Sequence, residues 1–440
     1  MRKLLSFVFG LCFVVASYAD LTIQIVQGVN KPYPIAIVPF GHDLQALPGL
    51  PNGLTGVINN DLNNSGRFAP LAQSLMPSKP SEIQNFNWKQ WNNANTGIEY
   101  ALIGNVTPGT TPNTYTVTFA LLSLLNNKPL VGLKFSNIPE AQMRLLAHQI
   151  SDTVYQTVTG KKGYFRTRLA YVTVDHHTSP NALWELVVSD YDGYNPTVLL
   201  KQTNIPITSP AWSANGSELA YVTYINNRQA VMSITLASAK RKIIANFPGM
   251  NSAPAFSPDG KYIAMALSGS DTSDNSNIYV MDLSTRKLTK YTTFANNTSP
   301  TWSPDSKSIA FNSDRGGSPQ IYLLNLSDSS VSRLSYTGAS NYAPVFMPDG
   351  QSLVIMTQQI PGGPIRIATL NLASNAINMI TNGQLDKSPS IAPNGDMVVY
   401  TNYNTTNGIL SAASLDGTVQ LRLPATEGSV ESSAWSPFLN

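Results

Sequence analysis

The chain has 440 residues, of which 42% are hydrophobic and only 12% are charged, and it contains 30 prolines and 29 glycines. At roughly 100 to 200 residues per domain, this length suggests two or three domains, each with enough chain for a core. Charged residues usually make up about a quarter of a globular protein, so the composition predicts a turn-rich and β-rich chain. The 28 basic and 25 acidic residues give a net charge of +3, which lacks the strong basic excess of a nucleic-acid-binding protein.

The N-terminus has the pattern of a secretory signal peptide. Two basic residues precede an apolar run over 4–16, which is shorter than the roughly 20 residues of a membrane span. Small residues up to Ala19 fit the cleavage rule, so we predict a signal peptide over 1–19 that is removed before Asp20. The single cysteine, Cys12, leaves with it, so we expect no disulfide and no cysteine-bound metal in the mature protein. No later apolar run is long enough to span a membrane, and we expect a soluble exported protein.

Residues 20–162 predict a small α/β domain. A short apolar run between prolines is typical of a buried strand, and spacing by three and four residues is typical of a helix. The predicted strands are 33–40, 100–106, 115–125 and 130–136, and the predicted helices are 54–62, a weaker one over 81–91, and 139–158 with Leu145 on its apolar face. Gly160 closes the last helix, and residues 161–163 are predicted to form a hinge.

Residues 163–440 contain a repeat. Its anchors begin at Pro210, Pro254, Pro300, Pro344, Pro389 and Ser433, so successive spacings are 44, 46, 44, 45 and 44 residues. A period of about 40 to 45 residues, with short strands separated by turns, is typical of the four-stranded blade of a β-propeller. The repeat therefore predicts an all-β propeller domain.

The number of strands predicts how this propeller closes. A second strand follows an anchor in five repeats, and a sixth copy of it at 169–172 has no anchor before it. The last anchor, around Trp435, has no second strand after it. We therefore predict a six-bladed β-propeller in which the C-terminal strand supplies the inner strand of the first blade, because closure removes exposed strand edges.

Candidate catalytic residues are sparse. The four histidines form no close ligand pattern, and the adjacent pair His176 and His177 is interpreted as part of an exposed loop. The Ser-Thr-Arg-Lys stretch at 284–287 is interpreted as an outer turn. Aspartates that recur in the anchor turns are expected to accept backbone amides, and aromatic residues that recur at one register are expected to pack the blades. The aspartates are Asp259, Asp305 and Asp349; the aromatic residues are Trp212, Phe256, Trp302, Phe346 and Trp435. We predict no catalytic residue, no metal site and no cofactor.

One face of the propeller is the candidate binding surface. Antiparallel strands send successive loops to opposite faces, so the loops that lead into the anchors share a face with the loops between second and third strands. These loops, which we call the loop face, are rich in Asn, Ser and Gly. Such a surface suits hydrogen-bonded protein recognition, although a set of ordinary polar loops would have the same composition.

Several stretches resemble the TolB family, the periplasmic components of the Tol-Pal system of Gram-negative bacteria. The resemblance covers essentially the whole mature chain, and its specific stretches are 34–40, 61–68, 163–172, 189–195, 251–260, 423–426 and 434–437. It implies a non-enzymatic periplasmic adaptor that binds the peptidoglycan-associated lipoprotein Pal and the inner-membrane protein TolA. It further implies a role in outer-membrane integrity and in envelope constriction at cell division, with other envelope proteins as further partners.

The resemblance also implies where partners bind. Pal is expected on the loop face, where Asn251, Ala253, Asn297 and Thr298 match the family's contact motifs, joined by the neighbouring loop residues Met250, Ser252, Asn341, Tyr342 and Asp386. Met250 stands where relatives often carry histidine. TolA is expected to bind a mobile segment over 20–30, which lacks the acidic residues expected in the family; its candidate contacts are Asp20, Leu21, Thr22, Ile23, Gln24 and Ile25.

Two enzymatic alternatives remain open at this point. Propellers of this repeat type also cap oligopeptidases, but few residues follow the closing strand, and we expect no hydrolase domain. A propeller enzyme with a metal or acid–base site in its central channel would need His, Glu or Asp side chains to converge on the axis. We expect instead a monomeric adaptor without a nucleic-acid partner.

Overall fold

The computed structural model describes residues 31–44, 47, 49–50, 52–176, 181–269, 275–403 and 406–439. The predicted signal peptide, the predicted TolA contacts over 20–25 and His177 lie outside these residues. Described residues from Pro32 onward belong to one compact unit. No helix within the described part of the chain is long and apolar enough to cross a membrane.

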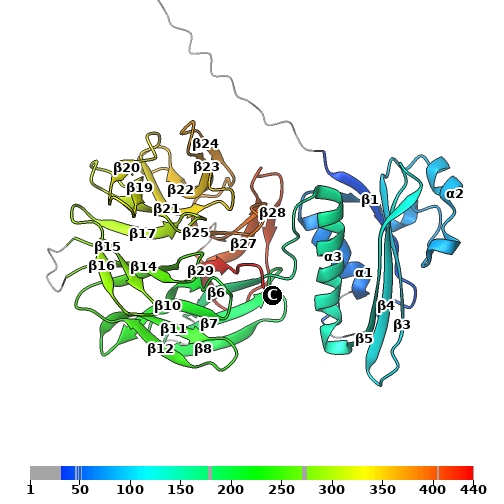
Figure 1. The fold of residues 1–440 in the computed structure, drawn as a ribbon, viewed down its shortest axis with the longest axis horizontal. Helices are drawn as coiled ribbons and strands as arrows, with labels where there is room; N and C mark the ends of the chain where they lie inside the picture. Colours follow the sequence, from blue (N-terminus) through cyan, green and yellow to red (C-terminus); the bar gives the residue numbers. More distant parts are fainter. Residues whose placement is uncertain are drawn as a thin grey trace, which may run out of the picture. The chain divides into compact units, whose positions relative to one another are not determined.

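The N-terminal part is a five-stranded sheet with helices, in the strand order β2-β1-β3-β4-β5 (Figure 1). β1 pairs in parallel with β2 and β3, whereas β3, β4 and β5 are antiparallel neighbours. The strands are β1 (Tyr33–Ile37), β2 (Phe68–Pro70), β3 (Tyr100–Pro108), β4 (Thr114–Ser123) and β5 (Lys128–Pro139). The helices are α1 (Gly53–Asn64), α2 (Trp88–Asn93) and α3 (Met143–Thr159), with 3-10 turns η1 (Gln73–Leu75), η2 (Ile83–Asn85) and η3 (Glu140–Gln142).

Two details of these helices differ from the sequence prediction. The expected helix over 81–91 is two short pieces, η2 and α2, because the Asn87 side chain accepts the Gln90 amide and starts a new helix there. Leu145 is 52% exposed and was wrongly placed on the buried face of α3. The buried stripe runs through Leu146, Ile150 and Val154 instead, at a spacing of four residues. Gly160 ends α3 in the left-handed conformation with φ 76°.

The remaining strands form six four-stranded antiparallel sheets, which are the blades of a propeller (Figure 1). The first strands of neighbouring blades contact one another and line the centre. From the inner to the outer strand, blade 1 is β29 (Ser429–Trp435), β6 (Arg168–Asp175), β7 (Leu183–Asp190) and β8 (Thr197–Thr203); blade 2 is β9 (Thr208–Trp212), β10 (Glu218–Ile225), β11 (Arg228–Thr235) and β12 (Arg241–Ala245); blade 3 is β13 (Asn251–Phe256), β14 (Tyr262–Leu267), β15 (Asn277–Asp282) and β16 (Leu288–Lys290).

Blade 4 is β17 (Asn297–Trp302), β18 (Ser308–Ser313), β19 (Gln320–Asn325) and β20 (Val331–Arg333); blade 5 is β21 (Ser340–Phe346), β22 (Ser352–Gln358), β23 (Ile365–Asn371) and β24 (Ile377–Met379); blade 6 is β25 (Asp386–Ile391), β26 (Met397–Asn402), β27 (Ile409–Ser414) and β28 (Gln420–Arg422). The predicted closure is confirmed, because β29 pairs antiparallel with β6 and places Ala434 opposite Ala170. The C-terminal strand thus completes the first blade.

The repeated residues hold the blades together as the sequence predicted. Trp302 Nε1 donates to the Ala255 carbonyl of the preceding blade at 2.9 Å, and Trp212 Nε1 donates in the same way to Ala434 at 3.1 Å. In the anchor turns, Asp305 accepts the Lys307 amide at 3.1 Å, and its counterparts Asp259 and Asp349 accept the equivalent amides. The anchor aspartates therefore tie their own turns, and the anchor tryptophans Trp212 and Trp302 join neighbouring blades.

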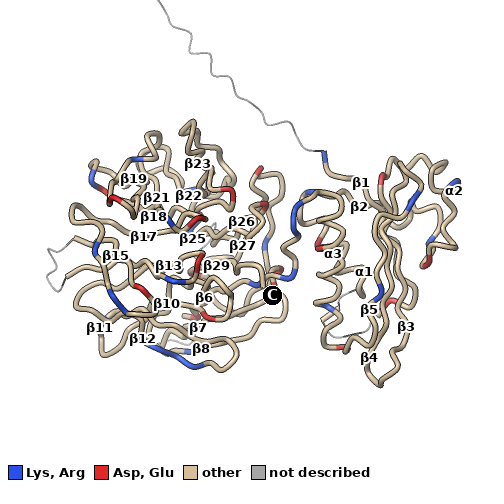
Figure 2. Tube along the Cα trace, viewed as in Figure 1, with Lys and Arg blue, Asp and Glu red and all other residues tan. Residues whose placement is uncertain are grey.

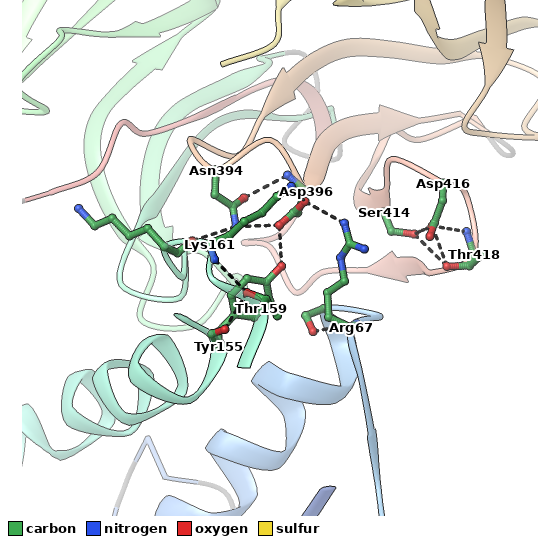
Figure 3. A network of polar contacts seen from close by, with 11 residues as sticks. Arg67, Tyr155, Thr159, Lys161, Asn394, Asp396, Ser414, Asp416 and Thr418 are labelled. Atoms are coloured by element: carbon green, nitrogen blue, oxygen red, sulfur yellow. Dashed lines mark hydrogen bonds and ion pairs between the residues drawn. The ribbon is translucent and has the colours of Figure 1, made fainter. Parts of the chain in front are cut away.

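The predicted hinge residues contact blade 6. Lys161 Nζ lies 2.8 Å from Oδ1 of Asp396, which is in the turn between β25 and β26 (Figure 3). Asn394 Nδ2 donates to the Lys162 carbonyl at 3.1 Å, and the Lys162 ammonium lies 4.0 Å from the centre of the Phe438 ring. The residues between α3 and β6 are therefore attached to the propeller at three points.

Candidate functional site

The loop face brings equivalent residues of four consecutive blades together. Asn251, Asn297, Asn341 and Asp386 each lie three residues before an anchor proline, at or next to the start of an inner strand. Their strand partners are the last or next-to-last residues of the neighbouring second strands, as in the pairs Asn297 with Ser313 and Asp386 with Asn402. The loops between second and third strands therefore open on the same face, as predicted.

These four residues are fully buried, with 0% exposure. Asn297 Nδ2 donates to the carbonyls of Phe294 and Ala295 at 2.9 Å each, and its Oδ1 accepts Arg315 Nη2 at 2.8 Å. Asp386 accepts the Thr381 hydroxyl at 2.5 Å and the Asn402 amide at 2.6 Å. Since these four residues are buried and each is hydrogen-bonded inside the protein, they position the loops of the face and do not themselves reach a partner.

The loops held by these residues present exposed aromatic side chains. Asn251 Nδ2 donates to the Phe247 carbonyl at 2.7 Å, just as Asn297 holds the carbonyl of Phe294. Phe247 is 38% exposed and Phe294 is 66% exposed, and Tyr336 in the corresponding loop of blade 5 is 61% exposed. Sequence reasoning missed these three residues, because the loop lengths before the anchors differ and the aromatic positions fall out of register.

The other predicted Pal contacts are half-buried: Met250, Ser252, Ala253, Thr298 and Tyr342. Thr298 and Tyr342 line a hollow of about 450 Å³ between blades 4 and 5. The hollow is also lined by Asn312, Met356 and Ile365, which lie in strands or at a strand end and which the loop pattern of the sequence does not indicate. Two of them could have been found from strand register, since Asn312 is opposite Thr298 and Met356 is opposite Tyr342.

A backbone bulge lies near the start of each of the inner strands β13, β17, β21 and β25. The residue before the anchor proline has a positive φ in each case: 49° at Ala253, 51° at Ser299, 44° at Ala343 and 52° at Ser388. The pairing with the second strand shifts register at the same place. A bulge bends a strand and redirects the side chains before it. In β17, for example, the bulge separates Asn297 and Thr298, which belong to the loop face, from the part of the strand that packs the blade.

The electrostatics of the face are those of a neutral surface. Figure 2 shows acidic and basic residues scattered over the blades. At the hollow, Asp314 accepts both the amide nitrogen and the side-chain amide of Asn296, at 2.8 and 2.9 Å. The Arg315 guanidinium lies 4.9 Å from the centre of the Tyr322 ring, and burial lowers its pKa. Both charges are therefore engaged internally, and the exposed chemistry is hydrogen bonding and apolar contact.

One group of potential metal ligands occurs among the described residues, and it is away from the inner strands. Asp61, His148 and Asp192 bring one ligand atom each within 4.8 Å of one another where α1 and α3 meet the turn after β7. Protein donors already occupy the two carboxylates: Tyr191 and His148 bond to Asp61, and Arg144 bonds to Asp192. On the loop face, Asp314 and Asp386 are likewise occupied by protein donors, an arrangement that does not favour acid–base catalysis.

The fold and this face define a class: a six-bladed β-propeller joined to a small α/β domain, with a neutral loop surface suited to protein recognition. Residues 155–439 match the family described as TolB beta propeller domain, and residues 21–130 match the TolB amino-terminal domain. The chain belongs to the TolB family, which confirms the resemblance seen in the sequence.

Full-length relatives agree with this assignment. The Tol-Pal system protein TolB of Francisella tularensis subsp. tularensis is 36% identical over 99% of this chain and 98% of its own length. The protein of the same name from Hydrogenovibrio crunogenus is 37% identical over the full length of both chains. The crystal structure of TolB from Acinetobacter baumannii superposes with a TM-score of 0.82 at 33% identity, over 93% of this chain and 97% of that one.

Proposed function

We propose that this protein is a periplasmic, non-enzymatic adaptor of the Tol-Pal system, in which the loop face binds the lipoprotein Pal and the mature N-terminus binds TolA. In this role it supports outer-membrane integrity and envelope constriction at cell division. Membership of the TolB family and the Tol-Pal names of its relatives support the proposal. The domain boundaries belong to it: residues 20–162 form the N-terminal domain, with 20–30 as the partner-binding segment, and residues 163–440 form the propeller.

The observation that carries the Pal site is the hollow between blades 4 and 5. Thr298 and Tyr342 lie in its wall, next to loops whose conformation is held by buried Asn297 and Asn341. A volume of about 450 Å³ accommodates a few side chains of a protein partner, and interface energy is usually concentrated in such pockets. The neutral lining favours a partner that contributes apolar and hydrogen-bonding side chains rather than a highly charged one.

The proposed TolA site has a different chemistry. Leu21, Ile23 and Ile25 alternate with Thr22 and Gln24, which is the pattern of a strand with one apolar face. A free segment of this kind binds by adding a strand to the edge of a partner's sheet, where the backbone supplies the hydrogen bonds and alternate side chains supply specificity. Deletion of residues 20–25 is expected to abolish TolA binding and to leave Pal binding in place.

Calorimetric titration of residues 20–440 with the soluble Pal domain of the same organism tests the Pal site. We expect saturable binding that Thr298→Arg abolishes, because the larger cationic side chain fills the hollow. Thr289→Arg is the matched control, since Thr289 is an exposed threonine on the outer strand β16, and it should bind Pal normally. A folded chain that does not bind Pal would refute the proposal. Equal Pal affinity of Thr298→Arg and Thr289→Arg would show that the hollow is not the Pal site.

A further inference from the structure

A buried charged cluster joins the N-terminal helices to the propeller. His148 of α3 is 1% exposed, and its Nδ1 lies 2.9 Å from Oδ2 of Asp61 in α1, which is also 1% exposed. The other oxygen of Asp61 accepts the Tyr191 hydroxyl, from the turn after β7, at 2.7 Å. Asp192 of the same turn is bonded to Arg144, one helical turn before His148. Three separate elements therefore meet at one imidazole.

The cluster contains more acidic than basic groups. Arg144 is its permanently positive member and contacts both Asp190, at 3.5 Å, and Asp192. That leaves the buried carboxylate of Asp61 with neutral donors unless His148 is protonated. The titratable and charged groups that face the imidazole are Asp61 from α1, Arg144 from α3, and Tyr191 and Asp192 from the turn after β7. Asp190 contacts Arg144, and Asp152 and Tyr164 interact electrostatically with Asp61.

Electrostatics favour a proton on His148. A buried carboxylate without a positive partner is strongly unfavourable, and an imidazolium in hydrogen-bond contact relieves that cost. Burial alone would lower the pKa of His148, but the charge and hydrogen bond of Asp61 and the charge of Asp192 outweigh it, so the pKa is raised. Burial also raises the pKa of Asp192, although His148 and Arg144 oppose this. Both shifts mean that the cluster retains a proton that separated groups would lose.

We propose that His148 is a pH-sensitive latch between the two domains: its protonated form bonds Asp61 and balances Asp192, which holds α1 and α3 against the turn after β7. Because the group that binds the proton has a raised pKa in the folded chain, its stabilising contribution is complete below the ordinary histidine pKa near 6.5. That contribution is lost as the pH rises through the raised value. A pH above that raised value therefore loosens the contact while the apolar core around it remains.

The position of the cluster determines what a loosened latch would change. Tyr191 stacks edge-on against both His148 and Tyr164, with ring centres 5.5 Å apart in each pair, and Tyr164 does the same with Trp435 of the closing strand at 5.6 Å. The latch thus lies beside the residues that connect α3 to β6 and beside the strand that closes the ring. None of the residues of the cluster belongs to the loop face.

The first test is a direct titration of the histidines in the mature chain. Long-range proton–nitrogen NMR resolves imidazole nitrogens, and the chain has four histidines, of which His148 is assigned by its loss in His148→Gln. We expect the midpoint of His148 to lie above 6.5 and to fall in Asp192→Asn, which removes one of the charges that hold the proton. A midpoint below 6.5 in the unmodified chain overturns the proposal without requiring any variant to fold.

The second test asks whether the proton holds the domains. Urea unfolding of the unmodified chain and of His148→Gln is compared at about pH 6 and about pH 9, with His42→Gln as the control because His42 bonds only an amide oxygen, on Asn105. The difference in midpoint between the unmodified chain and His148→Gln should be large at pH 6 and small at pH 9, and His42→Gln should show no such change. An equal difference at both pH values overturns the latch. A urea midpoint of the unmodified chain that falls when EDTA is added also overturns it, because a bound cation and not a proton would then stabilise the cluster.

Discussion

Asp396 should be among the most costly carboxylates to remove from this protein. Its side chain is 3% exposed and accepts Arg67 Nη2 at 3.0 Å, Lys161 Nζ at 2.8 Å and the Tyr155 hydroxyl at 2.6 Å (Figure 3). All three donors come from the N-terminal domain or from the segment that follows it, whereas Asp396 lies in blade 6. Asp396→Ala therefore removes three contacts between them at once.

The magnitude follows from the burial of each donor. Lys161 is 53% exposed, so its ion pair contributes only about 0 to 1 kcal/mol, because the ammonium returns to water. Tyr155 is fully buried, and losing a hydrogen bond from a buried donor to a charged acceptor costs about 1.5 to 3 kcal/mol. With Arg67 left partly buried without its partner, we expect Asp396→Ala to lower the free energy of unfolding by about 3 to 5 kcal/mol.

Urea denaturation at neutral pH measures this loss, and Gln351→Ala is the matched control. Gln351 occupies the same position in the turn of blade 5, where it is exposed and is bonded through its backbone, which an alanine keeps. It should cost less than about 0.5 kcal/mol, as surface substitutions usually do. Equal losses for the two variants would show that Asp396 does not tie the domains together.

The pH dependence gives a second check on Asp396. Burial raises the pKa of Asp396, but the hydrogen bonds of Lys161 and Tyr155 and the charges of Lys161 and Arg67 outweigh it, so the pKa lies below the usual value. A carboxyl with a lowered pKa in the folded chain stabilises it above the unfolded pKa of about 3.9, and that contribution is lost as the pH falls through the lowered value. The difference in the free energy of unfolding between Asp396→Ala and the unmodified chain should accordingly become smaller in acid.

Three further predictions concern the propeller. Deletion of 433–440 removes the last three residues of β29, which pair with 169–171 of β6, and should cause unfolding or aggregation, seen as a lower melting temperature and as aggregates in light scattering; unchanged melting contradicts closure by the C-terminal strand. Trp302→Phe leaves the Ala255 carbonyl without its donor and should cost about 1 to 2 kcal/mol in urea unfolding, with a similar cost at Trp212. Asn297→Ala frees the loop carrying Phe294. It should lower the free energy of unfolding by about 2 kcal/mol, and calorimetry should also show weaker Pal binding by the variant that remains folded. Normal Pal binding would show that this loop is not part of the site.

The fold could be predicted almost completely from sequence, because the repeat carries its own register. Once the anchors at Pro254 and Pro300 define a period, each strand in one blade identifies its counterpart in the next, and the unpaired ends at 169–172 and Trp435 require each other. The N-terminal domain has no repeat, and there each element depends on a single local pattern. Local patterns placed α1 and α3 correctly, but they put Leu145 on the wrong face of α3 and missed the cap at Asn87.

The contacts between the domains could not be predicted from the sequence. Asp61 and Tyr191 are 130 residues apart, and Arg67 and Asp396 are 329 residues apart. Each of these residues, taken alone, is an ordinary polar residue near the end or on the face of an element, and one sequence gives no covariation to pair them. Burial is what distinguishes them, and burial here depends on how the helices meet the turns of blades 1 and 6.

The candidate site shows what a repeat reveals and what it hides. Residues that recur at one position in consecutive blades, such as Asn251, Asn297 and Asn341, recur because these blades need the same internal bonds at the start of their inner strands. A need that several blades share cannot distinguish one part of the face from another, and these residues are accordingly buried. Recognition of a particular partner has to come from positions where the blades differ, such as Phe294, Tyr336 and the lining of the hollow beside Thr298. In a propeller, the search for a binding site should therefore begin with the departures from the repeat.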